Sequence, residues 1–158
     1  MTLYHVSEDP DIAQFTPREP TPHWDSLNPV VWAIDEEHLA HYLLPRDCPR
    51  VCGYTERHQR FMAIESRWFE HAFHQTLFLY HLEPGSFHCV DAVAGYFVSE
   101  QVCLPTHVEI EDKPLERIVN LGLELHVVTS LWPVQEQVVN SGQDFSCIRM
   151  RYAQPPVS

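Results

Sequence analysis

The chain has 158 residues, of which 44% are hydrophobic and 20% charged, which is typical of one globular domain that needs no disulfide or metal to fold. No apolar run approaches the ~20 residues of a membrane span, and the chain opens without a signal-type apolar stretch, so we expect a cytoplasmic protein without a membrane partner. The formal net charge of −12 excludes general nucleic-acid binding, because a phosphate backbone repels a protein of the same sign.

Strand-like and helix-like segments alternate from the start of the chain. A first strand is expected over residues 3–7 and a second over 30–34, separated by a Pro-rich loop at 8–29 that is too long for a simple connection. Asp35 suits a helix N-cap, so we expect a helix from there to Leu44, where the following proline ends it.

The rest of the chain continues this alternation of short elements. Further strands are expected over residues 62–64, 76–82, 87–90, 95–98, 106–110, 123–128 and 145–150. Helices are expected over residues 66–73, from 114 to a glycine cap at 122, and over 133–140. Neither a repeat nor a composition shift marks a boundary. The sequence therefore predicts a single α+β domain over 1–158, with mixed or antiparallel sheets and a few short helices.

Histidine pairs are the strongest hint of a metal. His38/His41 and His71/His74 each lie three residues apart on an expected helix, and either pair could clasp a metal ion. No His-Glu-x-x-His signature accompanies them, and the five cysteines lack the paired Cys-x-x-Cys spacing of zinc sites. No metal site is assigned, and we expect the thiols to be reduced.

Arginine supplies nearly all of the positive charge. Two closely spaced pairs, Arg46/Arg50 and Arg149/Arg151, are candidates for holding a small anion. A guanidinium fork matches phosphate and carboxylate in a fixed geometry. Solvated surface arginines would give the same pattern.

The first strand, Tyr4-His5-Val6-Ser7, resembles the aromatic-His-Gly-Ser strand of ADP-ribosyltransferase domains of the poly(ADP-ribose) polymerase type. In that family the histidine holds the nicotinamide ribose and the next backbone unit pairs with the carboxamide. The resemblance therefore implies ligand-binding roles for His5 and Val6. Val6 replaces the family's glycine. Its side chain narrows the space through which a ligand can approach, but the backbone N–H and C=O at this position are kept. A hydrogen-bonded core histidine is the structural alternative for His5.

The second strand and the segment after it resemble the next part of that family. The family's strand tyrosine corresponds to Val31, with Trp32 as the aromatic substitute, and Tyr42 stands eleven residues later, where a tyrosine stacks on nicotinamide. Leu39 replaces a serine, which removes a carboxamide hydrogen bond. Trp32 and Tyr42 would otherwise be ordinary core aromatics.

The segment Gly95–Val102 resembles the family's late strand and places Gly95 at the position of the catalytic glutamate, with Tyr96 next to it. That glutamate stabilises oxocarbenium-like charge, so its absence removes the strongest electrostatic contribution to transfer. We expect His5, Tyr42 and Tyr96 to line one cleft, because the family brings its matching strands side by side.

These segments cover a minor part of the chain. The whole chain also resembles a small uncharacterised bacterial domain family with the same Trp-Ala-Ile-Asp and Pro-Arg-Asp-Cys-Pro-Arg segments. The resemblance implies an ADP-ribosyltransferase-like arrangement whose cleft holds a nucleotide or small anion, with NAD as a candidate ligand, and lacks the catalytic glutamate. Two alternatives stay open: a phosphotransferase or glycohydrolase that uses His and Arg, and a metal-dependent hydrolase that uses the histidine pairs.

Overall fold

The computed structural model describes residues 1–24 and 26–156, and the chain forms two compact units. Unit 1 consists of residues 1–39 and 77–111, and unit 2 of residues 40–76 and 112–158. The predicted α+β class, with antiparallel and mixed sheets and short helices, is confirmed. Each unit is assembled from two separate stretches of chain.

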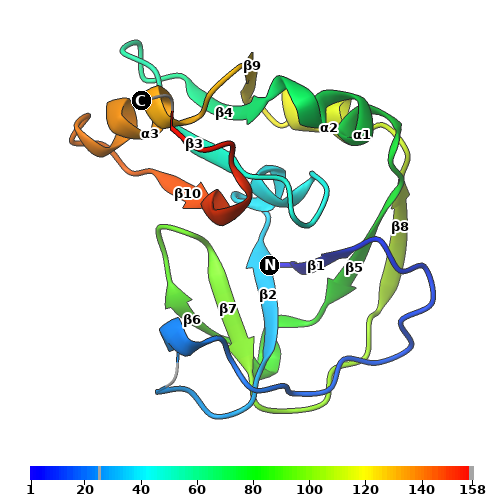
Figure 1. Cartoon of the computed structure of the whole chain (residues 1–158). Helices are drawn as coiled ribbons and strands as arrows, with labels where there is room; N and C mark the ends of the chain where they lie inside the picture. Colours follow the sequence, from blue (N-terminus) through cyan, green and yellow to red (C-terminus); the bar gives the residue numbers. More distant parts are fainter. Residues whose placement is uncertain (25, 157–158) are drawn as a thin grey trace. The chain divides into compact units, whose positions relative to one another are not determined.

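Unit 1 is built on a six-stranded antiparallel sheet with the order β6-β7-β2-β1-β5-β8 (Figure 1). The strands are β1 (Leu3–Ser7), β2 (Val31–Asp35), β5 (Leu77–Leu82), β6 (His88–Asp91), β7 (Tyr96–Ser99) and β8 (His107–Glu111). Two 3-10 turns, η1 (Pro22–Trp24) and η4 (Pro84–Ser86), complete the unit. The segments that resemble the transferase family therefore lie on the neighbouring strands β1, β2 and β7, apart from Tyr42.

The strand register sorts the side chains of this sheet onto two faces, because residues paired across antiparallel strands point the same way. One face carries the core cluster Leu3, Phe15, Val31, Ala33, Tyr80, Leu82 and Cys103. The Pro-rich loop covers this face: Phe15 exchanges main-chain hydrogen bonds of 2.8 and 2.9 Å with Cys103, and the Tyr80 hydroxyl accepts the Ile12 N–H at 3.1 Å. The first part of the loop, residues 9–15, thus packs against the core.

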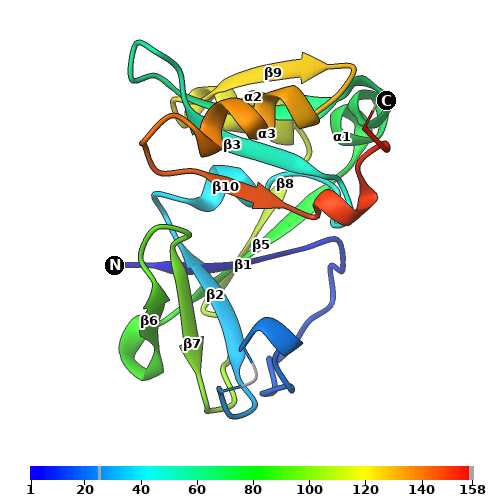
Figure 2. The same ribbon diagram turned by 60° about the vertical axis from the view of Figure 1, so that its left-hand side comes forward.

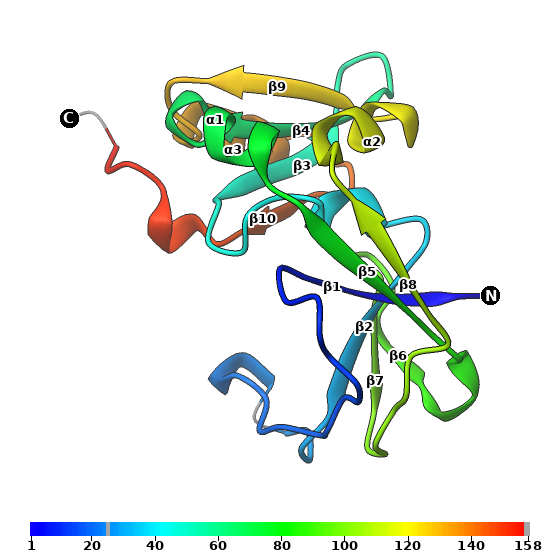
Figure 3. The same ribbon diagram turned by 90° about the vertical axis from the view of Figure 1, so that its right-hand side faces the viewer.

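Unit 2 is built on a four-stranded mixed sheet with the order β10-β3-β4-β9, in which only β4 and β9 are parallel. Its elements are β3 (Arg50–Tyr54), β4 (Arg60–Glu65), β9 (Glu124–Val128), β10 (Ser146–Ile148), α1 (Phe69–His74), α2 (Pro114–Asn120) and α3 (Trp132–Val139), with the 3-10 turns η2 (Leu39–Tyr42), η3 (Ser66–Trp68) and η5 (Met150–Tyr152). Figures 2 and 3 show α3 on one side of the sheet and α1 and α2 on the other. Leu131 and Val138 anchor α3 to Val51, Phe61 and Ala63.

Between residues 35 and 54, one sequence-based expectation is wrong and one strand was missed. The expected helix to Leu44 is a 3-10 turn, because the Leu39 and Leu43 N–H groups donate to carbonyls three residues back. β3 was not expected, since Arg50 and Gly53 interrupt its apolar pattern. Gly53 is required there: a Cβ atom would lie 2.7 Å from Cγ1 of Val138.

Within the described residues, no helix has the length and apolar character that crossing a bilayer requires.

Candidate functional site

Three aromatic side chains from separate segments of unit 1 meet beside β2 and β7. Trp24 comes from η1, Trp32 from β2 and Tyr96 from the start of β7. The ring centroids lie 5.5 Å (Trp24–Trp32), 5.7 Å (Trp32–Tyr96) and 6.4 Å (Trp24–Tyr96) apart, with interplanar angles of 65°, 78° and 77°. We call these three half-buried residues the aromatic corner, because their rings stand close to perpendicular to one another.

The strand register explains this meeting. Trp32 and Tyr96 are diagonal neighbours on adjacent antiparallel strands, so their side chains point to the same face. The pairing of β1 with β2 places Tyr4 and Val6 on that face as well. Three of the expected ligand residues, Val6, Trp32 and Tyr96, therefore share one face. Trp24, which joins them from the Pro-rich loop, was missed by the sequence reasoning.

His5 lies on the opposite face, with the core residues. It packs against Phe15 at 4.5 Å between ring centroids, and its Nδ1 lies 3.3 Å from the main-chain oxygen of Trp32. Alternation along β1 and β7 therefore separates His5 from Tyr96. We expected His5 and Tyr96 to line one cleft. Because the two side chains point to opposite faces of the sheet, a cleft on one face cannot contain both, and that expectation is wrong.

Gly95 occupies a position that has no room for a side chain. Its φ is +75°, and a Cβ atom would lie 2.4 Å from Nδ1 of His38 and 2.8 Å from Oδ1 of Asp35. Asp35 Oδ1 accepts the His38 main-chain N–H at 2.9 Å and lies 2.7 Å from the ring Nδ1, while the Asp35 N–H donates to the Gly95 carbonyl at 3.1 Å. A glutamate at residue 95 would meet both this pair and an unfavourable backbone conformation.

The other expected ligand residues lie in unit 2. Tyr42 ends η2 and is half-buried, and Arg46 is exposed. Arg149 is half-buried with a φ of 59°, and the guanidinium of exposed Arg151 lies 4.8 Å from the centroid of the Tyr152 ring. Their roles in binding a ligand stay predictions.

Arg50 is a structural residue, which corrects its expected role in binding an anion. It is 2% exposed, and all three of its guanidinium nitrogens donate to main-chain carbonyls at 2.8–3.0 Å: those of His41, Pro45 and Cys48. Burial lowers the pKa of its guanidinium, since desolvation disfavours the charged form. Arg50 therefore holds the segment 41–48 in place. Its guanidinium nitrogens are buried and already hydrogen-bonded, so none is available to a phosphate.

Charge is divided very unevenly between the units. Unit 1 has 13 acidic residues and one basic residue, Arg18, whereas unit 2 has nine of each. The whole net charge of −12 therefore belongs to unit 1. The aromatic corner thus belongs to a unit whose net negative charge favours cations over phosphate.

The histidines contact neighbours other than a metal. His71 stacks on Trp68 at 5.9 Å between centroids, and His74 Nε2 lies 3.2 Å from a carboxylate oxygen of Glu70. Across residues 1–24 and 26–156, no three His, Cys, Asp or Glu side chains form a group that could hold a metal ion. The metal-dependent hydrolase thus gains no support from these residues.

The cysteines are free thiols, and two of them are deeply buried. Burial raises the pKa of Cys48 and of Cys52 to about 12, because desolvation disfavours the thiolate. Neither is a nucleophile at neutral pH.

The chain belongs to a family of unknown function, DUF6886, whose model matches residues 4–60 and 53–153. No curated protein and no solved structure matches the chain. The family supplies no activity, so the function must be inferred from the site.

Proposed function

We propose that unit 1 binds a nucleotide through a flat cationic base, with the oxidised nicotinamide ring of NAD as the chemical model, and that it does so without glutamate-dependent ADP-ribosyl transfer. The observation that carries this proposal is the aromatic corner of Trp24, Trp32 and Tyr96, which lies in a unit with 13 acidic residues and one basic residue. Aromatic faces and carboxylates both attract a cation, and neither attracts a phosphate.

The geometry of the corner suits a flat ligand. In a near-perpendicular contact the edge of one ring meets the face of another, and the three half-buried rings present faces in different directions. A cation held over one such face gains about 0.5–2 kcal/mol, depending on its desolvation. The pyridinium of oxidised nicotinamide is both flat and positively charged, so stacking and charge act together on it.

The resemblance to ADP-ribosyltransferase domains adds support. The segments that match the family lie on β1, β2 and β7, which are neighbours in the sheet. His5, at the position of the family's histidine, lies on the face opposite the corner, and Gly95, at the position of the family's glutamate, directly precedes β7. There Phe15 packs on His5, and the Asp35–His38 pair takes the space beside Gly95. The proposed ligand binding and the proposed absence of transfer therefore rest on different residues of unit 1.

The phosphate groups of such a ligand have few partners in unit 1, whose sole Lys or Arg side chain is Arg18. In unit 2, Arg46, Arg149 and Arg151 stay predicted ligands of a small anion, independently of the ligand of unit 1. A phosphotransferase that relied on all four expected arginines would lack Arg50. The base of the nucleotide, rather than its diphosphate, should dominate affinity.

Calorimetric titration of the full chain with NAD and with ADP-ribose tests this proposal. ADP-ribose keeps the diphosphate and lacks the cationic ring, so we expect NAD to bind about fivefold more tightly, the ratio that ~1 kcal/mol of cation–π energy produces. Trp32→Leu should remove this preference. Trp68→Leu, in unit 2, is the matched control and should keep it.

Two results would contradict the proposal. Equal affinities for NAD and ADP-ribose, or a preference that survives Trp32→Leu in a variant with an intact melting transition, would remove the aromatic corner as the site. NAD consumption above the buffer blank in the same samples would show that transfer or hydrolysis occurs without the glutamate.

A further inference from the structure

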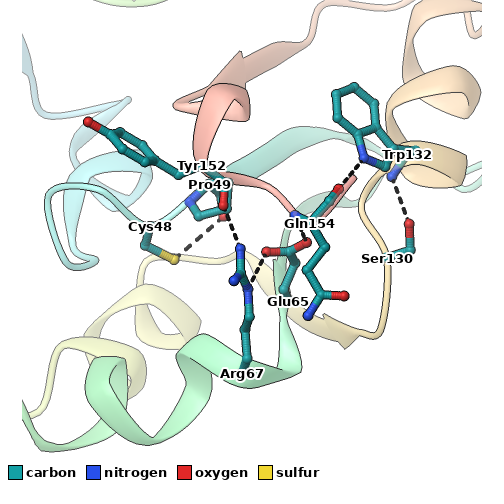
Figure 4. A network of polar contacts seen from close by, with 8 residues as sticks. All are labelled: Cys48, Pro49, Glu65, Arg67, Ser130, Trp132, Tyr152 and Gln154. Atoms are coloured by element: carbon teal, nitrogen blue, oxygen red, sulfur yellow. Dashed lines mark hydrogen bonds and ion pairs between the residues drawn. The ribbon is translucent and has the colours of Figure 1, made fainter. Parts of the chain in front are cut away.

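A buried carboxylate in unit 2 is satisfied by the last segment that the structure describes. Glu65 ends β4 and is 0% exposed. Its Oε1 accepts the Arg67 Nε–H at 3.1 Å, and its Oε2 accepts the main-chain N–H of Gln154 at 2.8 Å. Burying a carboxylate is unfavourable unless donors surround it. Residues 150–156, here called the strap, supply one of those donors (Figure 4).

Two further contacts hold the strap. The Trp132 indole Nε1–H donates to the Gln154 carbonyl at 2.5 Å, and Nη2 of Arg67 donates to the Tyr152 carbonyl at 2.5 Å. Figure 4 shows Glu65, Arg67 and Trp132 converging on the strap from different elements. We call these three residues the clasp: one acceptor and two donors aimed at neighbouring main-chain groups of one segment.

The clasp contacts the main chain of the strap rather than its side chains. Each of its three contacts with the strap reaches a backbone N–H or carbonyl, and Gln154 is exposed. The carbonyl that Trp132 binds comes directly before Pro155, and a second proline follows. Proline-containing peptides dock on aromatic surfaces because their extended conformation is already formed, so little entropy is lost.

Met150, the first residue of the strap, packs against the core cluster beneath α3, whereas the strap beyond Met150 has few contacts outside the clasp. Ala153 donates to the Met150 carbonyl within the strap, and Gln154 bonds only to Glu65 and Trp132 among residues 1–24 and 26–156. Segments with few contacts open at low free energy. The clasp residues lie at the end of β4, in η3 and at the start of α3, so secondary structure outside the strap positions their main chain.

We propose that Glu65, Arg67 and Trp132 form a peptide-binding clasp for an extended segment with proline after the bound carbonyl, and that Tyr152 and Gln154 of the strap occupy it in this structure. The partner is a proline-containing peptide of another chain, which displaces the strap and makes the same three main-chain contacts. A tethered segment competes at an effective concentration on the order of mM. The strap therefore shields the clasp from weakly binding peptides until it opens.

We expect Gln154→Pro to open the strap, because it removes the main-chain N–H of residue 154. Proline lacks the N–H that reaches Glu65, whereas Gln154→Ala, the matched control, keeps it. The probe is the fluorescently labelled peptide acetyl-Tyr-Ala-Gln-Pro-Pro-amide, titrated into the full-length chain and followed by anisotropy. We expect the Gln154→Pro chain to bind the peptide at least about tenfold more tightly than the wild type or Gln154→Ala, because its own strap competes less.

Two controls make the test specific to the clasp. Adding Trp132→Phe to Gln154→Pro should abolish the gain, and a probe with proline in place of its glutamine should not bind, since it lacks the N–H. The indole N–H resonance of Trp132 in a proton–nitrogen NMR spectrum reports on the folded chain directly. It should shift in Gln154→Pro and return toward the wild-type position when the peptide is added.

The proposal is overturned by any of three results: no saturable binding of the peptide to the Gln154→Pro chain up to about 1 mM, equal binding to Gln154→Pro and Gln154→Ala, or a Trp132 indole resonance that does not respond to the peptide.

Discussion

The two units use their charged residues in different ways. In unit 2, whose acidic and basic residues balance, the fully buried charges Arg50 and Glu65 bond to main-chain groups and hold the fold together. In unit 1, acidic residues outnumber basic ones thirteen to one, and the three rings of the aromatic corner are only half-buried. Burial and hydrogen-bond partners, rather than residue type, thus decide which arginine or aromatic side chain can contact a ligand.

The largest expected effect is the loss of Arg50. Arg50→Met keeps much of the volume but leaves the carbonyls of His41, Pro45 and Cys48 without their donor, so we expect unfolding to become easier by about 3–5 kcal/mol. Arg46→Met, at an exposed position, should change stability by less than about 0.5 kcal/mol. Urea unfolding measures both. Similar small changes in the two variants would break the structural assignment of Arg50.

A side chain at residue 95 should have the next largest effect. Gly95→Ala combines a positive φ with the contact to His38 and Asp35, so we expect a loss of about 2–4 kcal/mol. Gly122→Ala isolates the backbone contribution, since its φ is +94° and no atom lies within 4 Å of the added Cβ, and should lose only about 1–2 kcal/mol. Equal losses in thermal unfolding would show that the Asp35–His38 pair does not fill this space.

The buried thiols of unit 2 should make stability fall at alkaline pH. Their folded-state pKa of about 12 lies above the ordinary value of 9.0, so the unfolded chain releases these protons first as pH rises. The stability that the protonated thiols contribute is fully present below pH 9 and is lost between pH 9 and 12. At pH 10 the expected loss in the free energy of unfolding is about 1 kcal/mol per thiol. Cys52→Ala should flatten this decline. A slope identical to that of the wild type would contradict the assignment.

Sequence patterns predicted the positions of strands better than they predicted tertiary contacts. The strands at 3–7 and 77–82 were recognisable because β-branched and aromatic residues run up to proline, glycine or acidic turns. Trp24 was missed because its loop has no periodicity, and only the folded loop brings it beside Trp32. The division of charge was also hidden, since each unit joins two distant stretches of chain. The sequence comparison showed that Gly95 replaces the family's glutamate. The reason that a side chain does not fit there, the Asp35–His38 pair, is a contact that only the structure shows.

The central claim is that unit 1 recognises a cationic ring through its aromatic corner. The most direct measurement is a proton–nitrogen NMR titration of the full chain with N-methylnicotinamide cation and, separately, with neutral nicotinamide, following the four tryptophan indole resonances. We predict saturable shifts of the Trp24 and Trp32 indoles, with the cation bound about fivefold more tightly than the neutral ring. Equal affinities, or shifts confined to the tryptophans of unit 2, would contradict the account.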